Sequence, residues 1–217
     1  MDQQTITQAV KKVCSQLQSE KVPLGVSNRH LHLTQEHFDV LFPNQELTVK
    51  KPLRQPGHFA AEQTVNLIGP KSIIRNVRIL GPFRSQSQIE VSKTDARMLG
   101  VNAPYRLSGD LSDTPGIILR SEFAEIELDK GVIVALRHIH MPPLEALVYG
   151  VEHGDVVEVA IEGGNRNTVL SDVSIRVDPK VVLEMHVDTD EANAIDADNP
   201  NAYARILTKT NLFKSSF

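Results

Sequence analysis

The chain has one cysteine and few aromatic residues. Its 217 residues include Cys14 as the single cysteine and no tryptophan, and aromatic residues make up 5% of the sequence. One cysteine cannot form an internal disulfide, which is typical of a reducing cytosol. Because hydrophobic residues make up an ordinary 41% of the chain, a core can form, and aliphatic Val, Ile and Leu must fill it.

A net positive charge and long apolar runs are also missing. The formal net charge of −4 argues against non-specific nucleic-acid binding through a global positive field. No apolar run reaches the roughly 18 to 20 residues of a membrane span. The N-terminus lacks the apolar core and cleavage site of a secretory signal. We therefore expect no nucleic-acid partner and no membrane partner, while a local basic groove for a small anion stays compatible with this charge.

The first twenty residues have the pattern of a short amphipathic helix. Their apolar side chains recur at spacings of three and four: Ile6, Ala9, Val10, Val13 and Leu17. Such a stripe is expected either to pack on the body of its own protein or to dock a partner.

The rest of the chain is predicted to be mainly β with short helices. Predicted strands cover residues 22–27, 72–80, 88–91, 116–119, 131–137, 156–161 and 174–177. Predicted helices cover residues 34–42, 93–99, 142–149 and 179–185, with a further helical turn over 190–197. Gly-Pro, Pro-Gly and Gly-Gly breaks separate these elements.

Two histidine pairs of the same form stand out. They read Arg29-His30-Leu31-His32 and Arg137-His138-Ile139-His140. Residues i and i+2 of a strand point to the same face, so each pair directs two imidazoles toward one point. Neutral imidazole is a common ligand of Zn²⁺ and similar metals. One such pair is a weak signal, but two in the same context predict two metal sites, with satisfied structural histidines as the alternative.

The similarity between the two parts of the chain extends past the histidines. Residues 95–101 and 145–151 both read as the end of a helix that stops at a glycine, Gly100 or Gly150, where a left-handed C-cap is expected. Many short strands in a duplicated layout predict two small β-barrel domains related by internal duplication.

Other residues could complete a site. Glu90 lies between Ile89 and Val91 in a predicted strand, so it is either a solvated position or an inward ligand. His186 could complete a second site. The basic residues Lys71, Arg75, Arg78 and Arg84 lie close together in the sequence. Guanidinium groups bind phosphate with two hydrogen bonds, so this cluster beside a metal site suggests a phosphate-containing substrate.

Three segments carry a family resemblance. Residues 26–34, 81–96 and 135–141 resemble the phosphate propanoyltransferase family of bacterial microcompartments, a zinc-dependent phosphotransacylase. The resemblance covers about residues 22–207. It implies reversible transfer of a short acyl group, propanoyl or acetyl, between coenzyme A and phosphate. It also implies two Zn²⁺ ions in one cleft between two β-barrels, with Co²⁺ or another divalent metal as a possible substitute.

The resemblance also assigns roles to residues. It implies that His30, His32 and Glu90 hold one metal, and that His138, His140 and His186 hold the other. Arg84 matches the phosphate-binding, catalytic arginine. The positions that match coenzyme A contacts are Val26, Ser27, Asn28, Lys71, Arg78 and Asn193.

The resemblance further implies a domain layout and a location. Residues 21–28 plus 136–207 would form the first barrel, and residues 29–135 the second barrel, inserted in it. Residues 1–20 would be a targeting helix that binds microcompartment shell proteins, and residues 208–217 a C-terminal tail. The expected location is the lumen of a microcompartment in the bacterial cytoplasm, and a homodimer is the default expectation.

Two other functions fit part of the pattern. A dinuclear metal-dependent phosphoester hydrolase would use the same histidines and arginines, but it would have no need of coenzyme A. A non-catalytic, zinc-stabilised shell-binding protein would have closed sites with four ligands each. The sequence does not fix the acyl chain, because one methylene changes binding by only about 1 to 3 kcal/mol.

Overall fold

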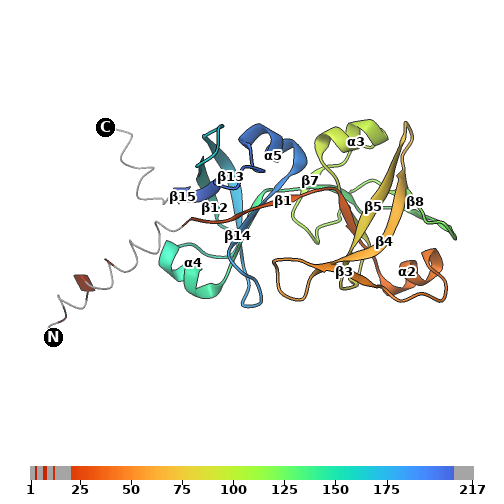
Figure 1. Ribbon diagram of the computed structural model, residues 1–217, viewed down its shortest axis with the longest axis horizontal. Coiled ribbons are helices and arrows are strands. Elements are labelled where there is room, and N and C mark those ends of the chain that lie inside the picture. Colours follow the sequence, from red (N-terminus) through yellow and green to blue (C-terminus); the bar gives the residue numbers. More distant parts are fainter. Residues whose placement is uncertain (1–2, 4–6, 9–11, 13–20, 208–217) are drawn as a thin grey trace. The chain divides into compact units, whose positions relative to one another are not determined.

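The structure is a computed structural model that describes residues 21–207, together with Gln3, Thr7, Gln8 and Lys12 (Figure 1). The amphipathic stripe predicted for residues 1–20 and the tail predicted for residues 208–217 thus fall largely or wholly outside the described residues. No helix in the described part of the chain has the length and apolarity that crossing a membrane requires.

The described chain is mainly β and divides into two compact units. Unit 1 comprises residues 21–26, 137–187 and 191–207, and unit 2 comprises residues 27–136 and 188–190. Each unit has one curled sheet and its own aliphatic core, so the prediction of a mainly β fold with short helices is confirmed.

Unit 2 is built on a nine-stranded sheet. The strand order is β7-β10-β6-β2-β5-β4-β8-β9, and β3 pairs with β4. The strands are β2 (His30–His32), β3 (Val49–Pro52), β4 (Phe59–Ile68), β5 (Ile73–Gly81), β6 (Gln88–Glu90), β7 (Tyr105–Arg106), β8 (Ile117–Arg120), β9 (Glu125–Leu128) and β10 (Val132–Ala135). Two helices belong to this unit, α2 (Gln35–Leu41) and α3 (Lys93–Leu99).

Unit 1 is built on a six-stranded sheet in the order β1-β14-β11-β13-β12-β15. Its strands are β1 (Leu24–Ser27), β11 (His138–Met141), β12 (Val156–Glu162), β13 (Thr168–Val177), β14 (Glu184–Asp188) and β15 (Tyr203–Leu207). The helices are α4 (Pro143–Tyr149) and α5 (Thr189–Ile195), and the first residues of α5 belong to unit 2.

The strands that carry the histidine pairs have the same kind of neighbours in both sheets. In unit 2, β2 pairs with β5 in parallel and with β6 in antiparallel. In unit 1, β11 pairs with β13 in parallel and with β14 in antiparallel. Each pair of histidines therefore lies on an inner strand, where both neighbours hold its backbone in register.

Local sequence signals set the ends of the helices. The side chain of Thr34 accepts a hydrogen bond from the backbone of His37 and begins α2. Helices α3 and α4 end at Gly100 (φ 82°) and Gly150 (φ 66°), both left-handed as predicted. The predicted helix over residues 179–185 is wrong. Turn and extended backbone occupy that range and lead into β14, because the alternating burial of a strand against β11 outweighs local helix propensity.

Aliphatic side chains fill both cores. In unit 2 the buried set includes Leu31, Ile79 and Ile89, which lie between ligand positions on β2 and β6 or on the adjacent β5. In unit 1 the equivalent places are taken by Ile139 and Met185. Because strand side chains alternate in direction, one face of each strand is anchored in the core while the other carries the candidate ligands.

Candidate metal centres

The first centre consists of His30 and His32 from β2 and Glu90 from β6. His30 and Glu90 are directly opposite each other across the antiparallel pair. One ligand atom from each of the three residues lies within 4.8 Å of the other two, and His30 Nε2 is 3.5 Å from Glu90 Oε2. All three side chains are buried, so a cation bound there would be largely shielded from water.

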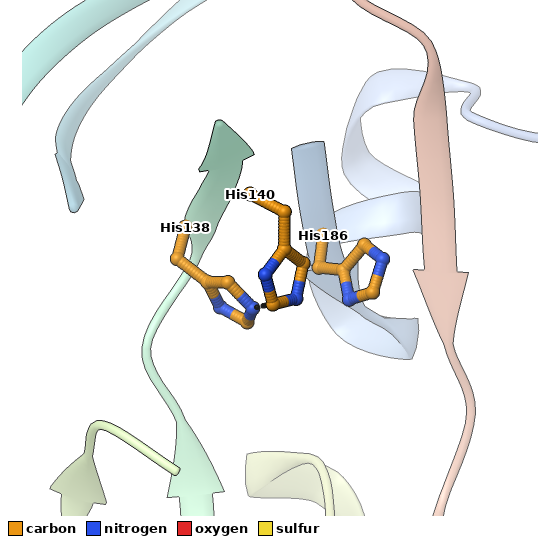
Figure 2. A group of neighbouring side chains, drawn as sticks. All are labelled: His138, His140 and His186. Carbon is orange, nitrogen blue, oxygen red and sulfur yellow. Dashed lines mark hydrogen bonds between the residues drawn. The ribbon is translucent and has the colours of Figure 1, made fainter. Parts of the chain in front are cut away.

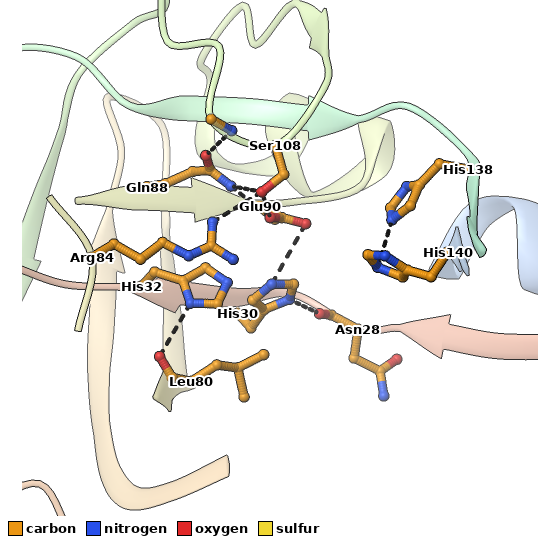
Figure 3. A network of polar contacts seen from close by, with 11 residues as sticks. Asn28, His30, His32, Leu80, Arg84, Gln88, Glu90, Ser108, His138 and His140 are labelled. Atoms are coloured by element: carbon orange, nitrogen blue, oxygen red, sulfur yellow. Dashed lines mark hydrogen bonds and ion pairs between the residues drawn. The ribbon is translucent and has the colours of Figure 1, made fainter. Parts of the chain in front are cut away.

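Backbone carbonyls fix the orientation of both imidazoles of the first centre (Figure 3). His30 Nδ1 donates to the carbonyl oxygen of Asn28 at 2.8 Å, and His32 Nδ1 donates to that of Leu80 at 3.1 Å. A carbonyl only accepts, so Nδ1 carries a proton in both rings, and Nε2 is the atom that each neutral ring would offer to a metal. This is the outer support that metal-binding histidines usually have.

Charge at the first centre is strongly coupled. Burial alone would lower the pKa of His30, but the negative charge of Glu90 and hydrogen bonds to Glu90 and Asn28 raise it above the usual value. Burial alone would raise the pKa of Glu90, and the charge of His30 instead holds it well below the usual value. Burial, His30 and Arg84 hold the pKa of His32 well below its usual value, so this imidazole is neutral.

A polar network joins this centre to Arg84. The guanidinium Nη1 of Arg84 donates to Ser108 Oγ at 2.9 Å, and Ser108 Oγ donates to Glu90 Oε1 at 3.1 Å. The buried Gln88 donates through Nε2 to Glu90 Oε1 at 2.6 Å and accepts from the backbone of Gly109 at 2.7 Å. Figure 3 shows Arg84 beside His32 and Glu90. The cationic group is thus held near the ligands.

Sequence reasoning did not single out Ser108 or Gln88 for this network. Gln88 had one available signal, because it lies two residues before Glu90 and so on the same face of the strand. Ser108 had none, since it follows β7 in a loop and reaches Glu90 only through the folding of that loop.

The second centre consists of His138 and His140 from β11 and His186 from β14, with one ligand nitrogen from each within 4.8 Å of the others (Figure 2). His138 Nε2 is 3.2 Å from His140 Nε2. In a tetrahedral zinc site with bonds of about 2.05 Å, two ligand nitrogens lie about 3.3 Å apart. The spacing of these two imidazoles therefore fits one shared ion.

Both centres follow one register. His138 lies directly opposite His186, just as His30 lies directly opposite Glu90. In each sheet the third candidate ligand therefore comes from the antiparallel neighbour, at the position that faces the first histidine of the pair. Among the described residues each cluster has three nitrogen or oxygen donors, which suits a metal ion with an exchangeable position.

The arginine before each histidine pair also has the same kind of partner in both units. Arg29 Nε is 3.1 Å from Asp95 Oδ2, and Arg137 Nε is 3.1 Å from Glu191 Oε1. Asp95 lies in α3, which follows β6, and Glu191 lies in α5, which follows β14. Each ion pair therefore connects the histidine strand to the helix that follows the strand with the third ligand.

Val26 and Ser27 lie at the end of β1, and Asn28 follows them. The Asn28 side-chain oxygen accepts from Thr189 Oγ1 at 3.3 Å, while its backbone supports a ligand of the first centre. Asn193 is exposed on α5.

Arg78 lies within β5, and Lys71 lies outside this strand. Arg78 of β5 is the parallel partner of His30, and its guanidinium donates to the carbonyl oxygens of Ala61 and Glu62. Lys71 is exposed and comes before β5 begins. Seven residues of extended chain span about 23 Å, so Lys71 lies well away from the first centre along this strand.

Comparison with known proteins identifies the family. The sequence profile of the phosphate propanoyltransferase family matches residues 23–198. The chain is 56% identical over 207 residues to a phosphate propanoyltransferase of Salmonella typhimurium, covering 95% of this chain and 99% of the relative. It is 56% identical over 208 residues to that of Citrobacter koseri (96% and 99%) and 54% identical over 207 residues to that of Shewanella putrefaciens (95% and 98%).

The chain belongs to the phosphate propanoyltransferase family. The resemblance noted in three sequence segments is thereby confirmed, and it extends over nearly the whole chain.

Proposed function

We propose that the protein transfers a short acyl group, propanoyl or acetyl, reversibly between coenzyme A and phosphate. One observation carries the proposal: a chain of this family forms a three-ligand cluster in each of its two units, and one of these clusters is joined to Arg84 by hydrogen bonds. The sulfur of coenzyme A and the oxygens of phosphate are the groups that a metal ion and a guanidinium would bind.

Two zinc ions are the proposed metals, and Co²⁺ would fit the same donors. His30, His32 and Glu90 would hold one ion, and His138, His140 and His186 the other. A zinc ion with an open position lowers the pKa of a coordinated thiol, so that thiolate is present near neutral pH.

The proposed transfer is direct. The thiolate sulfur of coenzyme A attacks the acyl carbon of the acyl phosphate and forms the C–S bond. The C–O bond to phosphate breaks, and phosphate leaves with its electron pair; the thiol proton has already passed to solvent. Arg84 would hold the phosphate oxygens and stabilise their charge as the bond breaks. No acyl-enzyme is required, so trapping a covalent acyl-protein during turnover would contradict this step.

Coenzyme A is proposed to contact six positions. These are Val26, Ser27, Asn28, Lys71, Arg78 and Asn193. The stretch of chain between Lys71 and Arg78 suits a long ligand with separate charged and thiol ends, because a distant cation could meet a phosphate of the nucleotide. The same contacts would serve the reverse reaction, in which the acyl group passes from coenzyme A to phosphate.

We also propose that the two units descend from one duplicated half. The shared register of the ligands and the matched ion pairs of Arg29 and Arg137 support it. In this proposal residues 21–28 plus 136–207 form one barrel and residues 29–135 the barrel inserted in it, and two copies of the chain form a homodimer.

Residues 1–20 are proposed to target the enzyme to the lumen of a bacterial microcompartment by binding its shell proteins. The apolar stripe of this segment supports a docking role. Deleting residues 1–20 should leave activity intact and distribute the protein through the cytoplasm. Loss of folding in the deleted chain would instead favour a segment that packs on its own protein.

The experiment combines metal analysis with an acyl-phosphate assay. Wild-type protein should contain two metal ions and form acyl-CoA from propanoyl phosphate only when coenzyme A is present, while His30→Ala should lose one ion and the activity. Phosphate release without coenzyme A would favour the hydrolase. Two tightly held metals with no turnover of either kind would favour the zinc-stabilised scaffold.

A further inference from the structure

A buried carboxylate without a role in the proposed reaction lies behind the second centre. Glu184 begins β14 and is only 6% exposed. Its Oε2 is 2.8 Å from His186 Nε2. Glu184 and His186 are two residues apart on one strand, so both side chains point to the same face. The helix predicted for residues 179–185 concealed this Glu-x-His pattern in the sequence.

The contact determines which nitrogen of His186 can meet a metal. An imidazole has two ring nitrogens, and a carboxylate accepts a hydrogen bond from the one that carries the proton. With Nε2–H directed at Glu184, the lone pair stands on Nδ1. The ring of His186 lies beside that of His140, with centroids 4.8 Å apart (Figure 2). Nδ1 is therefore the atom that His186 would offer to an ion shared with His138 and His140.

Glu184 also makes the charge distribution of the second centre different from that of the first. It lies directly opposite His140, the place that Gln88 takes opposite His32 in the other sheet. The first centre thus has its carboxylate among the ligands and an amide behind it. The second centre has three imidazoles as ligands and its carboxylate behind them. Each centre contains one buried glutamate. Glu184 lies two residues earlier on its strand than the position that matches Glu90.

Gly25 leaves the space that this arrangement needs. A Cβ atom at Gly25 would lie 3.0 Å from His186 Cδ2 and 3.1 Å from Glu184 Oε1. Contacts this short would displace both side chains together. The glycine of β1 therefore leaves room for the carboxylate and the imidazole beside the strand.

We infer that Glu184 is a positioning residue for the second metal centre, which holds His186 in the tautomer and orientation that present Nδ1 to the ion. The inference rests on the proposed function in one respect, because it requires a metal at the second centre. Partners of this kind fix the ring and make it a better donor, and their loss commonly lowers metal affinity about 10- to 100-fold.

The test measures metal binding without coenzyme A. Full-length protein is stripped of metal and titrated with Zn²⁺ against a chelating dye, and with Co²⁺ to record visible absorption. Wild type should bind two equivalents. Glu184→Ala should bind the second about 10- to 100-fold more weakly with the first unchanged. Glu184→Gln should fall between them, because its amide oxygen still accepts from Nε2 but carries no charge. Glu152→Gln, an exposed glutamate of the same unit, is the matched control.

A second measurement separates positioning from folding. In the His186→Ala background, adding Glu184→Ala should cause no further loss of affinity, since the ring that it positions is gone. The Co²⁺ spectrum of the second equivalent should change in Glu184→Gln while the circular dichroism spectrum stays that of wild type. Equal affinities and spectra in wild type and both Glu184 variants would overturn the inference. Wild-type protein that binds a single equivalent would overturn the second centre itself, and this role with it.

Discussion

The two candidate metal centres share a strand scheme and differ in what surrounds it. In both, a histidine strand lies between a parallel and an antiparallel neighbour, and the third ligand faces the first histidine. The first centre has a glutamate there, supported by Gln88 and Ser108 and close to Arg84. The second has His186, supported by Glu184. One backbone register can thus present two charge distributions, because the two paired positions hold Gln88 and Glu90 in one sheet and Glu184 and His186 in the other.

The largest expected effect tests whether the centres are separate. His30→Ala should remove the first metal and His138→Ala the second, each weakening its own ion by more than about 100-fold and abolishing acyl transfer. Metal content by mass spectrometry of the purified variants checks this. If either variant lost both ions, the centres would form one cooperative cluster and the comparison would fail.

The next largest effect tests the role of Arg84, the cationic side chain beside the first centre. Arg84→Lys keeps the positive charge but loses the planar pair of donors, so kcat/KM for the acyl phosphate should fall about 100-fold. Arg75→Lys, an exposed change on β5 of the same unit, should have no effect. A phosphate KM that is the same in wild type and Arg84→Lys would remove Arg84 from the phosphate site.

The matched arginines should differ in their effect on stability. Asp95 Oδ2 is buried and accepts no well-formed hydrogen bond, so its ion pair with Arg29 is the contact that compensates its charge. Arg29→Gln should cost about 2 kcal/mol in the free energy of unfolding. Arg137→Gln should cost about 1 kcal/mol or less, because Glu191 is more accessible to water.

Urea unfolding of the metal-free proteins measures both costs. The double variant Arg29→Gln/Asp95→Asn should recover part of the stability, because no buried charge is then left alone. Equal costs for the two arginines would mean that exposure does not distinguish the two pairs.

The smallest effect concerns the support of Glu90. Ser108→Ala removes one of two donors to Glu90 Oε1 and the acceptor of Arg84. A net hydrogen bond contributes about 1 kcal/mol, so metal affinity of the first centre should fall about 5-fold, and the second centre should be unaffected. Titration with the chelating dye measures the metal affinity of each centre separately. An unchanged affinity of the first centre would show that Gln88 alone is enough to support Glu90.

Local sequence patterns were enough to predict part of the fold. The cap at Thr34 and the left-handed glycines at Gly100 and Gly150 depend on contacts within one turn, so a short sequence window contains the cause. Residues 179–185 show the limit of such windows. Glu184 and Met185 pair with residues of β11 that are far away in the chain, and that pairing makes a strand of Glu184–Asp188.

The sequence alone determined the two histidine pairs and the face on which each pair lies, because alternation along a strand is a local property. The sequence also indicated Glu90 and His186 as candidates, and the family resemblance assigned each of them to a centre. Only the tertiary structure decided which side chains stand behind the ligands. The carbonyl of Leu80 reaches His32 across strands, and the hydroxyl of Ser108 reaches Glu90 through loop placement, so no periodicity within one segment encodes these two contacts. The carbonyl of Asn28 and the carboxylate of Glu184 each lie two residues from the histidine that they contact. The contact of Glu184 depends on strand β14, which is held by its pairing with β11.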